Sequence, residues 1–187
     1  SPRETPLSAG PVDLGAGRTA VALDVGEGHS CAILDTGAVR CWGYNGNGQL
    51  GLPLGNSVTI GDDEVPGAAA TVDLGVGRTA TAIAAGAFHT CAILDTGAVR
   101  CWGFNGDGQL GYGNTLQIGD NESPAAAGPV DLGAGRTATA ITVGFAFSCA
   151  LLDSGRVRCW GSNFFGQLGI ASTSDIGDDE SLATAPL

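Results

Sequence analysis

The sequence of 187 residues lacks methionine and lysine, so arginine supplies all 8 basic side chains against 19 acidic ones. The formal net charge of −11 would repel phosphate backbones and anionic membrane surfaces, which disfavours nucleic-acid binding as the main activity. No apolar run approaches the ~20 residues of a membrane span, so we expect no membrane insertion. There is no secretory signal, and the missing methionine favours Ser1 as a processed or excised start.

Catalytic motifs are also lacking. The two histidines, His29 and His89, occupy equivalent places in separate repeats. No serine–histidine–aspartate arrangement, phosphate-binding Gly-Lys motif or dinucleotide fingerprint accompanies them. The string Gly46-Asn47-Gly48 follows an expected strand without opening a helix, which is typical of a turn. We therefore expect a protein that is not an enzyme and that uses no organic cofactor.

One stretch is present three times. It reads CAILDTGAVRCWGYNGNGQLG from Cys31 to Gly51, and it returns from Cys91 to Gly111 and from Cys149 to Gly169. Recurrence at about 60 residues marks a repeat protein in which each copy is one supersecondary unit. We assign the repeats to residues 1–66, 67–124 and 125–187.

Each copy predicts a β-hairpin. In the first copy the loop Asp35-Thr36-Gly37 favours a type I turn followed by a left-handed glycine. Pairing the strands outward from this loop places Cys31 opposite Cys41 at a non-hydrogen-bonded site, where Cα atoms are about 4.5 Å apart and a disulfide can form. The same register predicts three bridges: Cys31–Cys41, Cys91–Cys101 and Cys149–Cys159.

Two alternatives to the disulfides remain at this point. The cysteines could stay reduced and act as small buried apolar side chains. A zinc site through His29, Cys31 and Cys41 is the sharper alternative, but the third copy has Phe147 where the others have histidine. Paired cysteines with an acidic surface fit an extracellular or cell-surface setting.

The rest of each repeat indicates more strands. Thr19 to Val25 is rich in β-formers and small apolar residues, and Val12 to Leu14 could add a short strand, giving four per repeat. Both faces of the hairpin are apolar, so each sheet needs a neighbour on either side. Four-stranded sheets stacked around an axis are propeller blades, and no sustained 3.6-residue pattern favours helices. The expected fold is all-β: three β-propeller blades in an arc completed by other copies or by missing repeats.

A long connection follows each hairpin. A tryptophan comes directly before it, and its first part has the motif N-x-x-G-Q-L-G with a glutamine at a fixed place. We expect the tryptophans to form the core between blades and the glutamines to bridge backbone groups of the loop. These residues are Trp42, Trp102 and Trp160, with Gln49, Gln109 and Gln167.

The second part of each connection is acidic. Carboxylates together with loop carbonyls are the ligands that calcium prefers. A solvated turn capped by aspartate side chains is the alternative, and the spacing is not that of a helix–loop–helix calcium site. The candidate ligands are Asp62, Asp63 and Glu64, then Asp120 and Glu122, then Asp178, Asp179 and Glu180.

Several motifs together carry a family resemblance. H-S-C-A from His29, the D-x-G turn, V-R-C-W-G from Val39 and N-x-x-G-Q-L-G from Asn45 resemble repeats of the regulator of chromosome condensation family. The resemblance implies a β-propeller, usually of seven blades. The family includes a nuclear guanine-nucleotide exchange factor, a secreted propeller that inhibits β-lactamases, and bacterial surface proteins. The cysteines and the acidic composition are more similar to the secreted bacterial members, so the resemblance does not carry over exchange activity.

Two candidate functions follow from an arc of three blades that does not close into a ring. An apolar face at each end favours association, and both termini stop in the same phase of the repeat. We therefore expect an extracellular structural protein that self-associates head to tail into a ring or a filament. The alternative is a secreted binding module that captures a protein or a saccharide through its loop face. Near-identical repeats favour the first, and loop differences such as Phe164 and Phe165 keep the second open.

Overall fold

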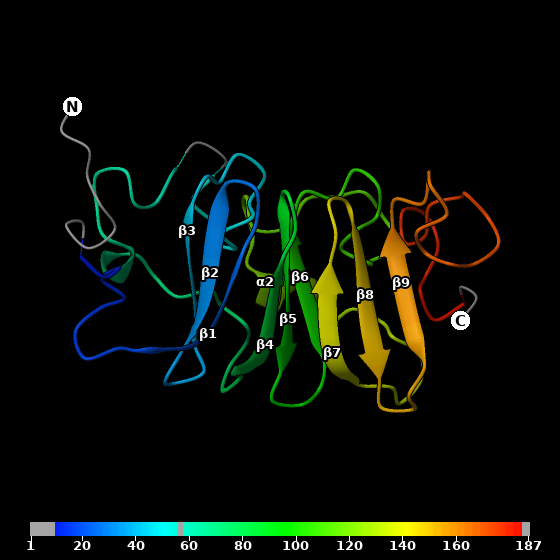
Figure 1. Cartoon of the computed structure of the whole chain (residues 1–187), viewed down its shortest axis with the longest axis horizontal. Coiled ribbons are helices and arrows are strands. Elements are labelled where there is room, and N and C mark those ends of the chain that lie inside the picture. Colours follow the sequence, from blue (N-terminus) through cyan, green and yellow to red (C-terminus); the bar gives the residue numbers. More distant parts are fainter. Residues whose placement is uncertain (1–9, 56–57, 185–187) are drawn as a thin grey trace.

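Three antiparallel sheets lie side by side along the long axis of the molecule (Figure 1). This computed structural model describes residues 10–55 and 58–184. The first sheet contains β1 (Ala20–Val25), β2 (His29–Leu34) and β3 (Val39–Gly43). The second contains β4 (Ala80–Ala85), β5 (His89–Leu94) and β6 (Val99–Gly103). The third contains β7 (Ala138–Val143), β8 (Phe147–Leu152) and β9 (Val157–Gly161). The all-β expectation is confirmed, and we call the sheets blades 1, 2 and 3.

The hairpin register is the one that the sequence predicts. Ala32 pairs with Arg40 and Cys31 with Cys41, and Gly37 has a φ of 77° in the turn. Each cysteine pair forms a disulfide, with Cα–Cα distances of 4.1, 4.1 and 4.0 Å in the three blades. No cysteine is free among residues 10–55 and 58–184. The zinc alternative therefore has no thiolate ligands, because both sulfurs are bonded to each other.

The expectation of four strands per repeat is wrong. Each sheet has three strands, and residues 12–14 form none. Their counterparts lie beside the preceding blade instead: the Val72 N–H donates to the Val39 carbonyl at 2.8 Å, and the Val130 N–H donates to the Val99 carbonyl at 2.8 Å. The segment cannot extend the sheet further, because an aspartate turn bends it; Asp73 Oδ1 accepts the Gly75 N–H at 2.9 Å.

The long connections are held against their own blade. Gly43, Gly103 and Gly161 form isolated bridges with Ile60, Ile118 and Ile176. Two helical turns that the sequence pattern did not predict, η1 (Pro66–Ala68) and α2 (Pro124–Ala127), begin at a proline. They are too short to leave a helical period in the sequence. No helix of the described residues is long and apolar enough to cross a membrane.

Apolar side chains fill the space between neighbouring blades. Between blades 1 and 2, Ile33 and Val39 pack in one cluster with Leu94 and Trp102, each at most 3% exposed. A second cluster of equivalent residues lies between blades 2 and 3. Full burial of a large apolar side chain contributes about 1.5–3 kcal/mol, so blade-on-blade packing is the main stabilising interaction of the array.

The disulfides generate a first prediction. Each bridge closes a loop with a sequence separation of 10, and constraining such a loop in the unfolded chain stabilises the fold by about 2–3 kcal/mol. Reduction should therefore lower the urea midpoint of unfolding. A thiol assay on the unfolded, unreduced protein should find no free thiol, and detection of six thiols would contradict the bridges.

Candidate functional site

A ladder of buried polar groups joins each blade to the next. The Gln49 carbonyl accepts the Thr90 hydroxyl at 3.1 Å and the Trp102 indole N–H at 3.0 Å, both from blade 2. The Gln109 carbonyl accepts the Ser148 hydroxyl and the Trp160 indole N–H, each at 2.9 Å, from blade 3. A buried indole N–H or hydroxyl without a partner costs about 1–3 kcal/mol. Because a shift of one blade would break these bonds, they fix the position of each blade relative to its neighbour.

Two histidines complete the ladder. His29 Nε2 lies 2.8 Å from Thr90 Oγ1, and His89 Nε2 lies 3.0 Å from Ser148 Oγ. Since each hydroxyl proton is already directed to a glutamine carbonyl, the imidazole must donate, which assigns the neutral Nε2–H tautomer. Burial lowers the pKa of His29 to about 4 and that of His89 to about 3. The histidines are therefore neutral structural donors.

The glutamine side chains bridge their own loop. The side-chain oxygens of Gln49, Gln109 and Gln167 accept the backbone N–H two residues earlier, at 2.8, 2.9 and 2.9 Å. Trp102 and Trp160 are fully buried, whereas Trp42 is half-buried because no blade precedes it among the described residues. Sequence reasoning missed Thr90 and Ser148, which have the same place in β5 and β8 as Ser30 in β2.

The two ends of the array are open. On blade 3, Val157 is 55% and Leu151 is 39% exposed, whereas the equivalent Val99 and Ile93 of blade 2 are at most 3% exposed. On blade 1, Leu23 is 68% exposed, whereas its counterpart Ile83 packs into the cluster between blades 1 and 2. Hydrophobic burial between blades therefore ends at two unpaired sheet faces.

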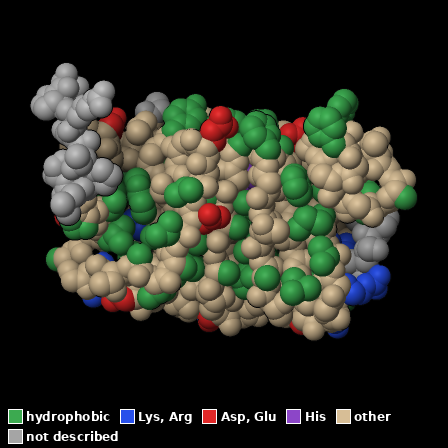
Figure 2. Space-filling model, in the orientation of Figure 1, with side chains coloured by type: hydrophobic (Ala, Val, Ile, Leu, Met, Phe, Trp, Pro, Cys, Tyr) green, Lys and Arg blue, Asp and Glu red, His purple; other side chains and the backbone are tan. Residues whose placement is uncertain are grey.

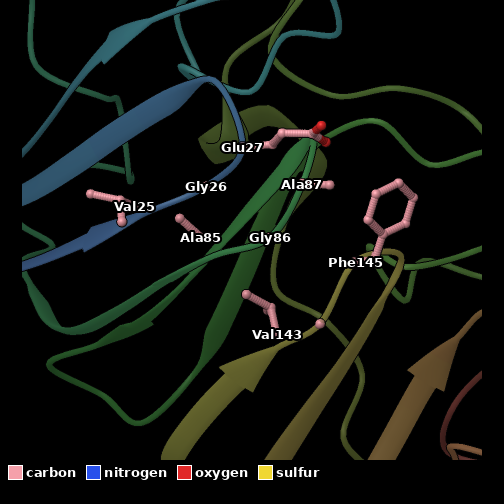
Figure 3. A pocket seen from close by; sticks show the side chains of 9 residues that line it. Val25, Gly26, Glu27, Ala85, Gly86, Ala87, Val143 and Phe145 are labelled. Atoms are coloured by element: carbon pink, nitrogen blue, oxygen red, sulfur yellow. The ribbon is translucent and has the colours of Figure 1, made fainter.

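The turns between the first two strands of each blade form a shallow depression of about 420 Å³ (Figure 3). Glycine is required here for close approach: a Cβ at Gly86 would lie 2.6 Å from the Gly144 carbonyl oxygen, and one at Gly26 would collide with the Gly86 carbonyl oxygen. Glu27 is the only ionisable side chain of its lining. The depression offers an apolar floor and no set of catalytic groups.

Sequence profiles place these repeats in a family. The profile described as the regulator of chromosome condensation (RCC1) repeat matches residues 20–49, 80–109 and 138–167, and a second RCC1 repeat profile matches residues 36–93. The chain belongs to the RCC1 repeat family. The matched ranges each begin at the first strand of a blade and end at the glutamine of the ladder, so the family pattern contains the groups that join one RCC1 blade to the next.

The chain is similar to longer RCC1 proteins. It is 30% identical over 159 residues to the ultraviolet-B receptor UVR8 of Arabidopsis thaliana, covering 84% of this chain and 33% of the receptor. It is 32% identical over 145 residues to the secretion-regulating guanine nucleotide exchange factor of Bos taurus, covering 77% of this chain and 28% of that protein. The chain thus spans about a third of the length of these relatives.

Solved structures show the same fold. Prp20p of Saccharomyces cerevisiae aligns with a TM-score of 0.64 and 19% identity, over 87% of this chain and 37% of that one. Yeast RCC1 (Prp20) in complex with Kap60 aligns with a TM-score of 0.63 and 19% identity, over 87% and 36%. The open arc of three RCC1 blades is therefore part of a propeller architecture.

The acidic segments of the RCC1 repeats differ among themselves. Carboxylate oxygens lie within 4.8 Å of one another in two groups: Asp62, Asp63 and Glu64, and Asp178, Asp179 and Glu180. The second repeat keeps Asp120 and Glu122 but has Asn121 between them. A hydrogen bond with Asp63 raises the pKa of Glu64, and burial raises that of Glu180 and Glu122. These oxygens suit calcium chemically, and calcium binding stays a prediction.

The histidine ladder predicts an acid-dependent loss of stability. The folded-state pKa values of about 4 for His29 and about 3 for His89 lie below the ordinary 6.5, so the unfolded chain binds more protons as the pH falls below 6.5. Between about pH 6.5 and pH 5, each histidine should cost about 2 kcal/mol of unfolding free energy.

The double variant His29→Phe/His89→Phe tests this, because the third repeat already has Phe147 at the equivalent position. Urea unfolding of the variant should show a much shallower pH slope in this window than the wild type. Equal slopes for the two proteins would contradict neutral buried histidines.

A third prediction concerns calcium. If the acidic groups bind it in the folded state alone, calcium at 100 times its Kd should stabilise the protein by about 2.7 kcal/mol, and a chelator should reverse the shift. The variant Asp63→Asn/Asp179→Asn should lose the response in a thermal melt. Melting temperatures that are the same with chelator and with excess calcium would eliminate the site.

Proposed function

We propose that this chain is a non-enzymatic assembly protein whose open blade faces stack head to tail with a second copy. One observation carries the proposal: the two ends of the array present complementary halves of the junction that already joins its blades. The leading face of blade 1 contains Val12, Ala20, Ser30 and Trp42. The trailing face of blade 3 contains Leu151, Gly155, Val157 and Gln167.

Donors at the leading face match acceptors at the trailing face. Inside the chain, Val72 donates to the Val39 carbonyl and Ala80 to the Gly37 carbonyl, each at 2.8 Å. Thr90 adds its hydroxyl to the Gln49 carbonyl. The counterparts at the leading face, Val12, Ala20, Ser30 and Trp42, make no such bonds among the described residues. Acceptors equivalent to Val39, Gly37 and Gln49 are the carbonyls of Val157, Gly155 and Gln167.

Glycines at the trailing face leave matching space. A Cβ at Gly37 or Gly97 would lie within 3 Å of the threonine that begins the next blade, whereas one at Gly155 would have no atom within 4 Å. A Cβ at Gly111 would lie 2.8 Å from the Trp160 indole nitrogen, whereas Gly169 again faces open space. The trailing face thus has the backbone shape that receives a threonine and a tryptophan, and Thr19 and Trp42 are the residues that a second copy would supply.

The junction between copies should be weaker than the junctions inside the chain. Phe147 replaces the histidine that donates to the next hydroxyl in the first two blades, so one hydrogen bond of the ladder is missing there. The assembly of several copies into an oligomer then depends on protein concentration. The three disulfides support an extracellular or otherwise oxidising setting for this assembly.

A second candidate function is capture of a protein or a saccharide. We call the end of the blades that carries the turns 26–28, 86–88 and 144–146 the loop face. Apolar side chains project along this edge of the array beside acidic ones (Figure 2). Phe145, Phe164 and Phe165 are 70%, 75% and 87% exposed, and exposed aromatic groups are typical of binding surfaces. Prp20p, a structural relative, is described as binding Gsp1p and histones.

If copies associate head to tail, a single charged side chain at an end of the array should weaken the association. Light scattering of the wild type should show a mass that rises with concentration in the micromolar range. Val157→Asp should lower the apparent affinity at least about tenfold, because a carboxylate would be buried without a partner. Val76→Asp, at a fully exposed turn position (102%), is the matched control and should behave as wild type.

A mixing experiment distinguishes head-to-tail from symmetric contacts. Val157→Asp leaves only the leading face intact, and Leu23→Asp leaves only the trailing face intact, so neither variant should oligomerise alone. An equal mixture should form a 1:1 dimer that grows no further. A wild type that remains a folded monomer at tens of micromolar, within the affinity range of weak interfaces, would overturn the assembly.

A further inference from the structure

A cavity of about 230 Å³ lies at the loop face, where blades 2 and 3 meet and Asn47 from the loop after blade 1 also lines it. Three phenylalanines line it: Phe88 from the β4–β5 turn, Phe145 from the β7–β8 turn and Phe104 from the loop after β6. The rings of Phe88 and Phe145 meet edge to face, with centroids 6.1 Å apart and planes at 80°. The Phe104 N–H donates to the Phe88 carbonyl at 2.8 Å, which ties the third ring to the first.

The repeats differ in sequence where this cavity forms. At the junction of blades 1 and 2, the places of Phe88 and Phe145 are taken by Gly28 and Ala87. The two aromatic walls are therefore absent from an otherwise equivalent junction. The blade packing is the same at both junctions without these rings, so the aromatic walls are available for binding.

Asp107 adds a carboxylate to the aromatic lining. In blade 1 its place is taken by Asn47, whose side-chain oxygen accepts the Gln117 amide at 3.3 Å across the junction. The counterpart of Gln117 in blade 3 is Asp175, so two neutral amides become two carboxylates. Burial, and then Asp175 and Asp178 nearby, raise the pKa of Asp107.

Asp107 and Asp175 are not partners in the salt bridges at the hairpin ends of the blades. These salt bridges are Arg18–Asp35, Arg78–Asp95 and Arg136–Asp153. Asp175 Oδ1 accepts the Asn163 N–H at 2.7 Å, which holds its carboxylate at the junction.

We propose that this cavity binds the guanidinium group of an arginine side chain presented by a protein partner. A cation over the face of an aromatic ring is attracted by its quadrupole, and the planar guanidinium also stacks on such rings. Its planar fork of N–H donors can bond both oxygens of the Asp107 carboxylate, whereas an ammonium offers three donors around a point charge. The net charge of −11 favours approach of a basic segment over the long range.

The cavity lies within one chain, so this proposal is independent of stacking between copies. The test uses the full chain and three blocked tripeptides of Gly-X-Gly, in which X is arginine, lysine or citrulline. Calorimetry and the amide resonances of residues 104–109 report binding. Arginine peptide should bind saturably, lysine peptide about three to tenfold more weakly, and citrulline peptide, the neutral isostere, at least about tenfold more weakly.

Two variants borrow residues from other repeats and so keep the fold. Asp107→Asn, the residue of the first repeat, should weaken arginine-peptide binding at least about tenfold, and Phe145→Ala, the residue of the second, about three to tenfold. Asp35→Asn, an exposed acid at the hairpin end of blade 1, removes the same charge and should leave binding unchanged.

Equal affinities for arginine and citrulline peptides would overturn the proposal, and so would unchanged binding by Asp107→Asn. A response of the same resonances to calcium alone, with none to the arginine peptide, would assign the carboxylates to a metal instead and would also overturn it.

Discussion

Each sheet of this protein is apolar on both faces, and its burial between two neighbours is the constraint on which the remaining structure depends. Hydrophobic packing alone would let the blades slide, because it has no direction. The backbone carbonyls of Gln49 and Gln109 supply the direction, since each accepts two buried donors from the next blade. Sliding by even one residue would leave an indole N–H and a hydroxyl buried without partners.

Several local features follow from that contact. His29 and His89 are neutral because the next blade desolvates them, and their single proton is directed to a hydroxyl whose own proton is already used. The inner turns are glycine because successive backbones nearly touch. The disulfides of blades 1 and 2 lie inside the same packed layers, where all four of their cysteines are fully buried. The surfaces that remain for binding are then the two ends of the array, where the ladder stops, and the loop face, where the repeats differ in sequence.

Those two places have different chemistry. At the ends, the ladder stops with donors on one face and acceptors on the other, which suits another RCC1 blade. At the loop face, the repeats diverge through Phe88, Phe145 and Asp107, which suits a small cationic group. The first surface is apolar and extended, and the second is a pocket of about 230 Å³. An RCC1 repeat array can carry both, because blade stacking uses the sheet faces and leaves the loops free.

The sequence by itself determined the three hairpins, their register and the pairing of Cys31 with Cys41, because a tight turn fixes strand alignment within ten residues of chain. It also gave the all-β class, through sheets apolar on both faces. Only the tertiary structure decided that residues such as Val72 pair with the preceding blade. It also decided that Thr90 and Ser148 link the histidines to glutamine carbonyls, and that the rings of Phe88 and Phe145 meet. Those contacts join residues about 60 apart, and spacing along the chain says nothing about how far one sheet is shifted over another.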